Sequence, residues 1–183
     1  MIMYNQRNWR DILSEKPKDM TREEFEKTLP KLDEDYMTTY RINRAKRNLR
    51  RFNDKYRSGM TEVSDERHNL DLATQMHHIF PASDYPAIAD YMENLIALTP
   101  TQHFSYAHPN NNTQYIDRAY QYLCLLAKTG SIRENLLGNK DVPIIYDFYL
   151  YQTVLSTGLE SDEFFDVEEM DFDGLLNKIE KYY

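Results

Sequence analysis

The spacing of apolar residues divides this chain of 183 residues into helical outer thirds and a non-helical middle, which limits the folds open to it. In the middle, LATQMHHIF at 72–80 and NLIALT at 94–99 have the length and composition of short strands. We therefore predict an α+β fold that is predominantly helical. The first third is predicted to be helical, with a capping box at Thr21–Glu24 and with Pro30 either interrupting the helix or occupying the first turn of a second one. That second helix would carry an apolar stripe of residues mostly three or four positions apart: Leu32, Tyr36, Tyr40, Leu49, Phe52 and Tyr56.

The residues around the two predicted strands carry local signals. Residues 61–70 have the composition of a polar loop. Thr99 followed by Pro100 is typical of a helix start, with the threonine as cap and the proline at the first position. We expect that helix to run over 99–107 and to end before Pro109, because proline disfavours the helical conformation in the residue that precedes it.

The last third returns to helical spacing. An apolar stripe predicts a helix from residue 116 that ends at Gly130. Pro143 is expected to open an aromatic-rich helix over 143–158. The apolar residues of the acidic final segment predict a terminal amphipathic helix through Leu175, Leu176 and Ile179.

The length is that of one domain, subdivided by composition into a basic helical region at 1–60, a core at 61–112 and an acidic helical region at 113–183. The single cysteine, Cys124, excludes a disulfide within the chain and a four-cysteine zinc site. No run of about 18 apolar residues is present, and the first ten residues include charged side chains. We therefore expect no membrane contact and a cytoplasmic location.

Charge is distributed unevenly along the chain. The net charge is −8, yet residues 1–60 hold 15 Lys and Arg against 10 Asp and Glu, and residues 141–183 hold 2 against 11. Segment 41–57 carries eight cations and one acid. The alternative interpretation is an ordinary solvated helix face, but such a face does not require so many cations. We predict that this segment binds nucleic-acid phosphates. The candidate DNA-binding residues are Arg41, Arg44, Lys46, Arg47, Arg50 and Arg51.

All five histidines lie between residues 68 and 108. A lone histidine is usually an ordinary core or surface residue. Here, however, His77 and His78 are adjacent near the end of a predicted strand, and His103 follows on a predicted helix. Neutral imidazole binds divalent metals, and it also accepts a proton near neutral pH. This grouping indicates a site that combines metal binding with acid–base chemistry.

The segment 76–109 has an order of residues that points to a known family. Its sequence is MHHIFPASDYPAIADYMENLIALTPTQHFSYAHP, with His-His-Ile-Phe-Pro first, then Asn94 opening Asn-Leu-Ile-Ala-Leu, then His103. This pattern resembles the HNH nuclease family. The intervals of 17 and 9 residues from His77 to Asn94 to His103 are similar to those of its colicin DNase subgroup. The flanking segments at 108–117 and 123–135 are similar to restriction-endonuclease members.

The resemblance implies a ββα-metal motif, which is a short two-stranded hairpin plus a helix, embedded among the flanking helices. It implies that His77 and His103 hold one divalent metal ion per chain, which neutralises charge on the scissile phosphate. His78 would be the general base that activates the attacking water. Asn94 would either bind the metal or hydrogen-bond backbone across the loop to orient His78, whose ring is expected to have a backbone carbonyl partner.

Two other histidines are less constrained. His108 lies five residues after His103, one position beyond the best place for a third ligand on an α-helix, and directly before Pro109. The sequence therefore leaves open whether His108 joins the metal set. His68 lies outside the motif, and we expect it to be a loop residue or a phosphate contact.

Two departures from the family pattern affect the metal. Many members hold a structural zinc with paired cysteines, which this chain lacks, and many carry Asp where this chain has His77. An all-imidazole set is softer than one that contains a carboxylate. We expect Mg in vivo, with Mn, Ni or Zn as alternatives.

The leading hypothesis is a DNA endonuclease that hydrolyses phosphodiester bonds by a one-metal HNH mechanism, of the type II restriction kind that defends against foreign DNA. Cleavage of both strands of a symmetric site with one active site per chain implies a homodimer on double-stranded DNA. The alternatives are a nonspecific or toxin-like DNase, and a non-catalytic nucleic-acid-binding module stabilised by zinc.

Overall fold

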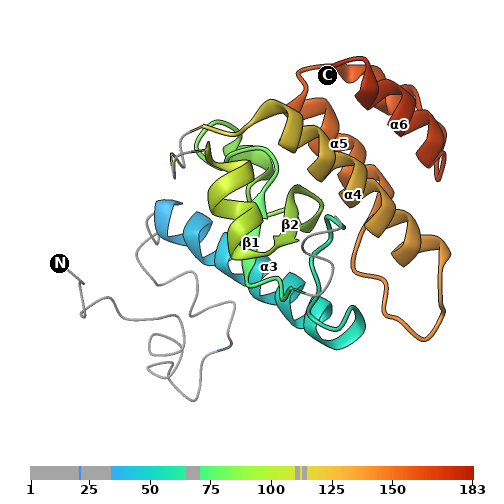
Figure 1. The fold of residues 1–183 in the computed structure, drawn as a ribbon. Helices are drawn as coiled ribbons and strands as arrows, with labels where there is room; N and C mark the ends of the chain where they lie inside the picture. Colours follow the sequence, from blue (N-terminus) through green and yellow to red (C-terminus); the bar gives the residue numbers. More distant parts are fainter. Residues whose placement is uncertain (1–20, 22–33, 65–70, 110–111, 113–114) are drawn as a thin grey trace, which may run out of the picture. The chain divides into compact units, whose positions relative to one another are not determined.

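The computed structural model describes residues 21, 34–64, 71–109, 112 and 115–183 (Figure 1). The chain divides into two units, 1–39 and 40–183, and the sheet and the helices after α3 belong to the second. The predictions made for Glu24, Pro30, Leu32 and His68 lie outside the described residues.

The described part is mostly helical with one two-stranded antiparallel sheet, which confirms the α+β prediction at that level. The strands are β1 (Gln75–His78) and β2 (Leu95–Leu98), and the longer helices are α3 (Glu34–Tyr56), α4 (Arg118–Leu137), α5 (Phe148–Gly158) and α6 (Phe172–Glu180). Short helical turns connect them: η1 (Pro86–Ile88), η2 (Met92–Asn94), the π-helical η3 (Gln102–Ala107) and η5 (Asp162–Asp166).

The β1–β2 hairpin lies between α3 and the C-terminal helices α4 and α5 (Figure 1). In its register His77 is opposite Ile96 and His78 is opposite Leu95. All four residues of β2 are fully buried, so this strand forms the centre of the core. The helices contribute apolar residues to the same core: Ala45, Leu49, Cys124, Leu125, Ile132, Tyr151, Val154 and Leu155.

The segment 61–63 lies along the second edge of β2; it has no regular secondary structure, as predicted for the loop at 61–70, but it is buried rather than exposed to solvent. The backbone amide of Glu62 donates to the Ala97 carbonyl at 2.9 Å, and its carboxylate accepts from the Ala97 amide at 2.9 Å. Thr61, Glu62 and Val63 are consequently buried. Their polar composition concealed a strand-like pairing, because the polar groups bond within the protein rather than to water.

The Glu62 carboxylate also links two helices to this edge. Lys128 of α4 places its Nζ 2.9 Å from Oε2, and Arg57, directly after α3, places Nη1 3.3 Å from the same oxygen. Burial alone would raise the pKa of Glu62, but the charges of Lys128 and Arg57 outweigh it and hold the pKa below its usual value. The carboxylate is therefore ionised at neutral pH, and it ties α3, β2 and α4 together.

Two predicted helix boundaries are wrong. Gly130 does not end α4, which continues to Leu137, because Ile132 and Asn135 of the next turn are buried and Gly130 itself is exposed. Pro143 does not open α5, which begins at Phe148 behind the cap Asp147. The Asn135 side chain holds the intervening segment by bonding the backbone at Pro143, Ile145 and Tyr146.

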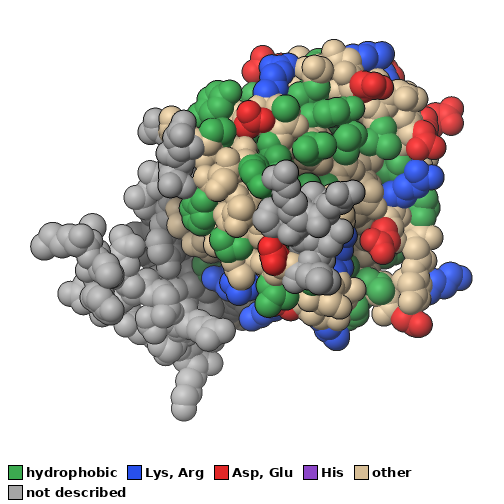
Figure 2. Space-filling view, viewed as in Figure 1, with side chains coloured by type: hydrophobic (Ala, Val, Ile, Leu, Met, Phe, Trp, Pro, Cys, Tyr) green, Lys and Arg blue, Asp and Glu red, His purple; other side chains and the backbone are tan. Residues whose placement is uncertain are grey.

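Apolar side chains are also exposed on the surface. Figure 2 shows hydrophobic side chains gathered on the face over which α4 runs. The large apolar residues of α4 that are exposed are Leu123 and Leu137. No helix within the described ranges has both the length and the apolar composition needed to cross a membrane.

Two helical glycines provide a matched test of the packing. A Cβ on Gly158 of α5 would overlap the buried ring of Phe80, whereas a Cβ on Gly130 of α4 would meet nothing within 4 Å. We expect Gly158→Ala to lower the free energy of unfolding by about 1–3 kcal/mol, because Phe80 must move. Gly130→Ala should raise it by up to about 1 kcal/mol, because alanine is the better helix former.

Urea unfolding of the two variants beside the wild-type protein measures both changes. Equal effects of the two substitutions would contradict the close packing of Phe80 on α5.

Candidate metal centre

The hairpin and the following helical segment bring three histidines together. His77 is the third residue of β1 and only 4% exposed, while His103 and His108 come from η3 and its C-terminal cap. The start of the helical segment is as predicted, since Thr99 Oγ1 accepts from the Gln102 amide at 3.1 Å. Gln102 is itself buried, and its side chain bonds Val63, which anchors this start to the edge of β2.

The helical segment is a π-helix, not the predicted α-helix, and this decides the place of His108. Its characteristic hydrogen bond runs five residues back, from the His108 amide to the His103 carbonyl at 3.2 Å. The wider turn contains one more residue than an α-helical turn. His108 therefore reaches the position beside His103 that Ala107 would occupy on an α-helix.

The three imidazole rings converge. The ring centroids are 5.2 Å apart for His77 and His103, 5.0 Å for His77 and His108, and 4.9 Å for His103 and His108, with interplanar angles of 76–80°. One nitrogen from each ring lies within 4.8 Å of the others. In the described part of the chain, no other group of three or more His, Cys, Asp or Glu side chains is placed closely enough to hold a metal ion.

Burial lowers the pKa of two rings of this cluster, those of His77 and His103. It holds the pKa of His77 well below its usual value, and neighbouring His103 and His108 lower that pKa further. The pKa of His103 is lowered to about 4, by burial first and then by His108 and Lys46. Because neutral imidazole is the form that binds a metal, the rings of His77 and His103 are able to coordinate a cation at neutral pH.

The hydrogen bonds around the rings fit a metal ion. His108 Nδ1 lies 2.8 Å from the carbonyl oxygen of Tyr115, to which it can only donate, so Nε2 keeps its lone pair for a ligand bond. His103 Nδ1 is buried and has no hydrogen-bond partner in the structure. A cation held by the three rings would complete the coordination of such a cluster, and the residues present therefore fit a divalent metal ion.

His78 lies next to this cluster but has a different partner. Its Nε2 is 2.9 Å from the carbonyl oxygen of Ala89, which makes Nε2 the protonated nitrogen and leaves Nδ1 able to accept a proton. This is the backbone carbonyl partner expected from the sequence. Burial, followed by the charge of Lys46, lowers the pKa of His78 to about 4, while the Ala89 carbonyl acts in the opposite direction.

Asn94 holds the loop that positions His78. Its Oδ1 accepts from the Phe80 amide at 2.9 Å, and its Nδ2 donates to the carbonyls of Phe80 at 3.0 Å and Ile88 at 3.3 Å. These bonds use both the oxygen and the nitrogen of the Asn94 side chain. The geometry therefore matches hydrogen bonding to the backbone across the loop, and not metal binding, as the role of Asn94. Ile88 immediately precedes Ala89, the partner of His78.

A cavity of about 180 Å³, which we call the His cavity, opens beside the cluster, and it is lined by Lys46 as well as by the four histidines: His77, His78, His103 and His108. Lys46 is half-buried, and burial lowers its pKa. It comes from α3 and brings a cationic side chain to the site. Lys46, predicted from the sequence to bind DNA together with the arginines of this helix, therefore lines a different cavity from Arg41 and Arg44.

The other predicted DNA-binding residues lie elsewhere on α3. Arg41 and Arg44 line a different pocket, and Arg50 pairs with Asp54 at 4.0 Å. Arg47 and Arg51 are exposed and form no ion pair with a described residue. The helical repeat could have indicated this division, because Lys46 is about 160° from Arg44 and 140° from Arg41 around the helix axis.

Comparisons with protein-family models, with curated proteins and with solved structures find no match to this chain.

The geometry predicts which histidines bind metal. We expect His77→Ala, His103→Ala and His108→Ala each to weaken Ni or Zn binding by at least about 100-fold, because each removes one ligand. His78→Ala should leave the affinity nearly unchanged, because its ring bonds Ala89 instead. Calorimetric titration of the four variants measures this directly. A loss of affinity only in His78→Ala would reverse the assignment.

Proposed function

We propose that this protein is a metal-dependent DNA endonuclease that hydrolyses phosphodiester bonds by the one-metal chemistry of the HNH family. The observation that carries the proposal is the division of labour around one cavity. Three imidazoles, from His77, His103 and His108, form a metal set, while His78 faces the same cavity with its ring held by Ala89 and one nitrogen unused. The resemblance of segment 76–109 to the HNH pattern and the order hairpin-then-helix support the same conclusion.

Each residue then has a chemical task. The bound metal ion would neutralise charge on the scissile phosphate and stabilise the leaving oxygen. His78 Nδ1 takes the proton of the attacking water, with the ring oriented by the Ala89 carbonyl. Lys46 would place its ammonium group against a phosphate oxygen, because among the described residues it is the only Lys or Arg that lines the cavity. A bound phosphate facing His78 would also raise the pKa of that ring toward the range a general base needs.

The ligand set bears on the identity of the metal. Mg and Mn prefer oxygen ligands, whereas a set of three neutral imidazoles suits Zn, Ni or Co. The inclusion of His108 therefore favours these softer ions over the Mg expected from the sequence.

A structural zinc site fits the arrangement less well. Structural zinc is normally enclosed by four ligands, most often cysteines, whereas three protein ligands beside an open position are typical of catalytic sites. Here three histidines border the His cavity, and the one cysteine, Cys124, is buried in the core. A structural site would also leave no task for His78.

The substrate we propose is double-stranded DNA, cut by a homodimer of the type II restriction kind. The exposed cations Arg47 and Arg51 of α3 give the protein phosphate contacts on the same helix that brings Lys46 to the His cavity. Plasmid cleavage with Mg, Mn, Ni or Zn and an EDTA control tests the activity. Discrete fragments would indicate site-specific cutting, and a smear would indicate a nonspecific DNase.

The general base is the most specific part of the mechanism. His78→Ala should lower the single-turnover rate of DNA cleavage by about 100- to 10,000-fold, because the proton acceptor is lost. The variant should still bind metal and DNA, which calorimetry and a gel-shift assay at the same protein concentration check. Cleavage by His78→Ala at close to the wild-type rate would contradict the mechanism.

DNA binding through α3 predicts a change in salt dependence. Replacing Arg47 and Arg51 by Gln should reduce the slope of log affinity against log salt by about 1.8, since each phosphate contact contributes about 0.9. Arg133→Gln together with Lys140→Gln removes two exposed charges from α4 and the loop after it, and should leave the slope unchanged. Fluorescence anisotropy with a labelled duplex gives both slopes, and equal slopes for the two double variants would place DNA elsewhere.

A further inference from the structure

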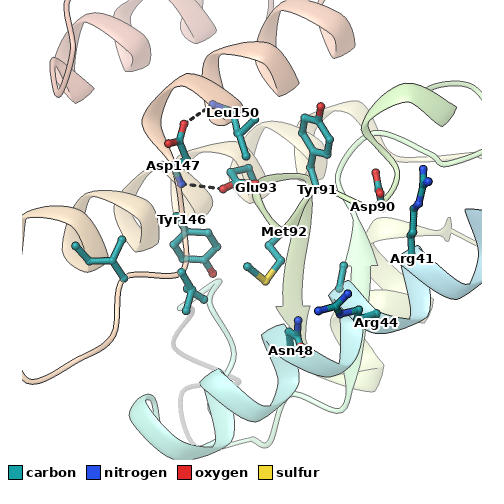
Figure 3. Close-up of a pocket in the computed structure, with 13 residues that line it drawn as sticks. Arg41, Arg44, Asn48, Asp90, Tyr91, Met92, Glu93, Tyr146, Asp147 and Leu150 are labelled. Atoms are coloured by element: carbon teal, nitrogen blue, oxygen red, sulfur yellow. Dashed lines mark hydrogen bonds between the residues drawn. The ribbon is translucent and has the colours of Figure 1, made fainter. Parts of the chain in front are cut away.

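A second and larger cavity, of about 440 Å³, shares no lining residue with the His cavity. Figure 3 shows the residues that line it. We call it the arginine pocket. Arg41, Arg44 and Asn48 line it from α3, each about one turn after the last. Its volume lies within the range of about 300–1,000 Å³ that is usual for small-molecule sites.

The α3 side of the pocket is suited to an anion. Arg41 and Arg44 are exposed and form no ion pair with a described residue, so both guanidinium groups are available to a ligand. Asn48 adds an amide one turn further along. Arginine binds phosphate through parallel N–H donors, and such charge-assisted hydrogen bonds are among the stronger ones in proteins.

The side of the pocket that faces α3 combines apolar and aromatic side chains with three carboxylates, those of Asp90, Glu93 and Asp147. Met92 and Tyr146 lie across from Arg44 and Asn48 (Figure 3), and Ile144, Ile145 and Leu150 complete this wall. Tyr146 is buried, and Met92 is half-buried. A thioether and an aromatic ring form a surface against which a flat heterocycle packs well.

A buried carboxylate borders the same wall. Glu93 is 3% exposed and accepts a hydrogen bond from the Asp147 amide at 2.9 Å (Figure 3). Burial raises the pKa of Glu93, although the Asp147 amide acts in the opposite direction. A further hydrogen-bond donor supplied by a ligand would therefore stabilise the charged carboxylate.

We propose that the arginine pocket binds a nucleotide whose base carries an exocyclic amino group. Its phosphate lies against Arg41 and Arg44, its base against Met92 and Tyr146, and its amino group toward Glu93. The nucleotide comes either from a DNA strand, as a base turned out of the stack, or from solution. This binding goes beyond the proposed nuclease activity and requires no metal, so either can fail without the other.

Titration calorimetry in EDTA with dAMP, dCMP, dGMP, dTMP and inorganic phosphate tests the pocket on the full chain. We expect the three amino-bearing nucleotides to bind at least about 10-fold more tightly than dTMP or phosphate. Arg41→Gln with Arg44→Gln should weaken them at least about 10-fold. The matched control, Arg133→Gln with Lys140→Gln, should not. Glu93→Gln keeps an acceptor for the Asp147 amide and should abolish the preference over dTMP.

A duplex that contains 2-aminopurine identifies the source of the nucleotide. A fluorescence increase on binding that the Arg41/Arg44 double variant loses would assign the pocket to a base of DNA. Mononucleotide binding without that increase would assign it to a free nucleotide. The proposal is overturned if inorganic phosphate binds as tightly as the nucleotides, if the Arg41/Arg44 variant binds them unchanged, or if neither mononucleotide binding nor the fluorescence change occurs.

Discussion

Much of this structure depends on a single carboxylate removed from water. A buried charge is tolerated only when its partners are in place, and losing one partner of such a pair is far more costly than losing an ion pair on the surface. The partners of Glu62 come from three parts of the chain, namely Arg57 after α3, the Ala97 amide of β2 and Lys128 of α4. A shift of any one of these segments would remove one of the partners that stabilise the buried charge. Since β1 pairs with β2 along its whole length, the position of His77 and His78 depends on this link.

The candidate site uses the alternation of a strand to give two adjacent, identical side chains different surroundings. Successive side chains of a strand point to opposite faces, so His77 turns into the imidazole cluster while His78 turns to the Ala89 carbonyl. The loop that carries Ala89 would be free to move if it were held by the chain alone. The Asn94 amide prevents this by bonding the loop at both ends, and Gln121 of α4 bonds the carbonyl of Ile79, the residue after His78. Orientation of His78 is thus a property of the folded loop.

The sequence patterns correctly predicted the elements whose formation depends on residues close to one another in the chain. The apolar spacing of α3, the two strands, the helix start at Thr99 and the terminal helix through Leu175 and Ile179 all follow from neighbours in sequence. The failures have non-local causes. Gly130 lies within α4 because the following turn is buried, and Glu62 is buried because its partners lie 35 and 66 residues away. The sequence of α4 did contain a signal that Lys128, a partner of Glu62, is buried. Lys128 stands four residues from both Cys124 and Ile132, which lie on the buried face of the helix.

The π-helical segment brings two histidines five residues apart, His103 and His108, to the same side of one turn, which an α-helix would not do. A π-turn has poorer hydrogen-bond geometry than an α-turn and persists where the surrounding structure compensates for it. Between His103 and His108 the chain therefore contains one residue more than the most stable helical winding would use. Removing a residue here would relax the helix and at the same time rotate one imidazole about a quarter-turn away from the other two. In this turn, the change that would increase the stability of the helix would also separate the three imidazoles. Selection for stability alone would therefore disrupt the cluster.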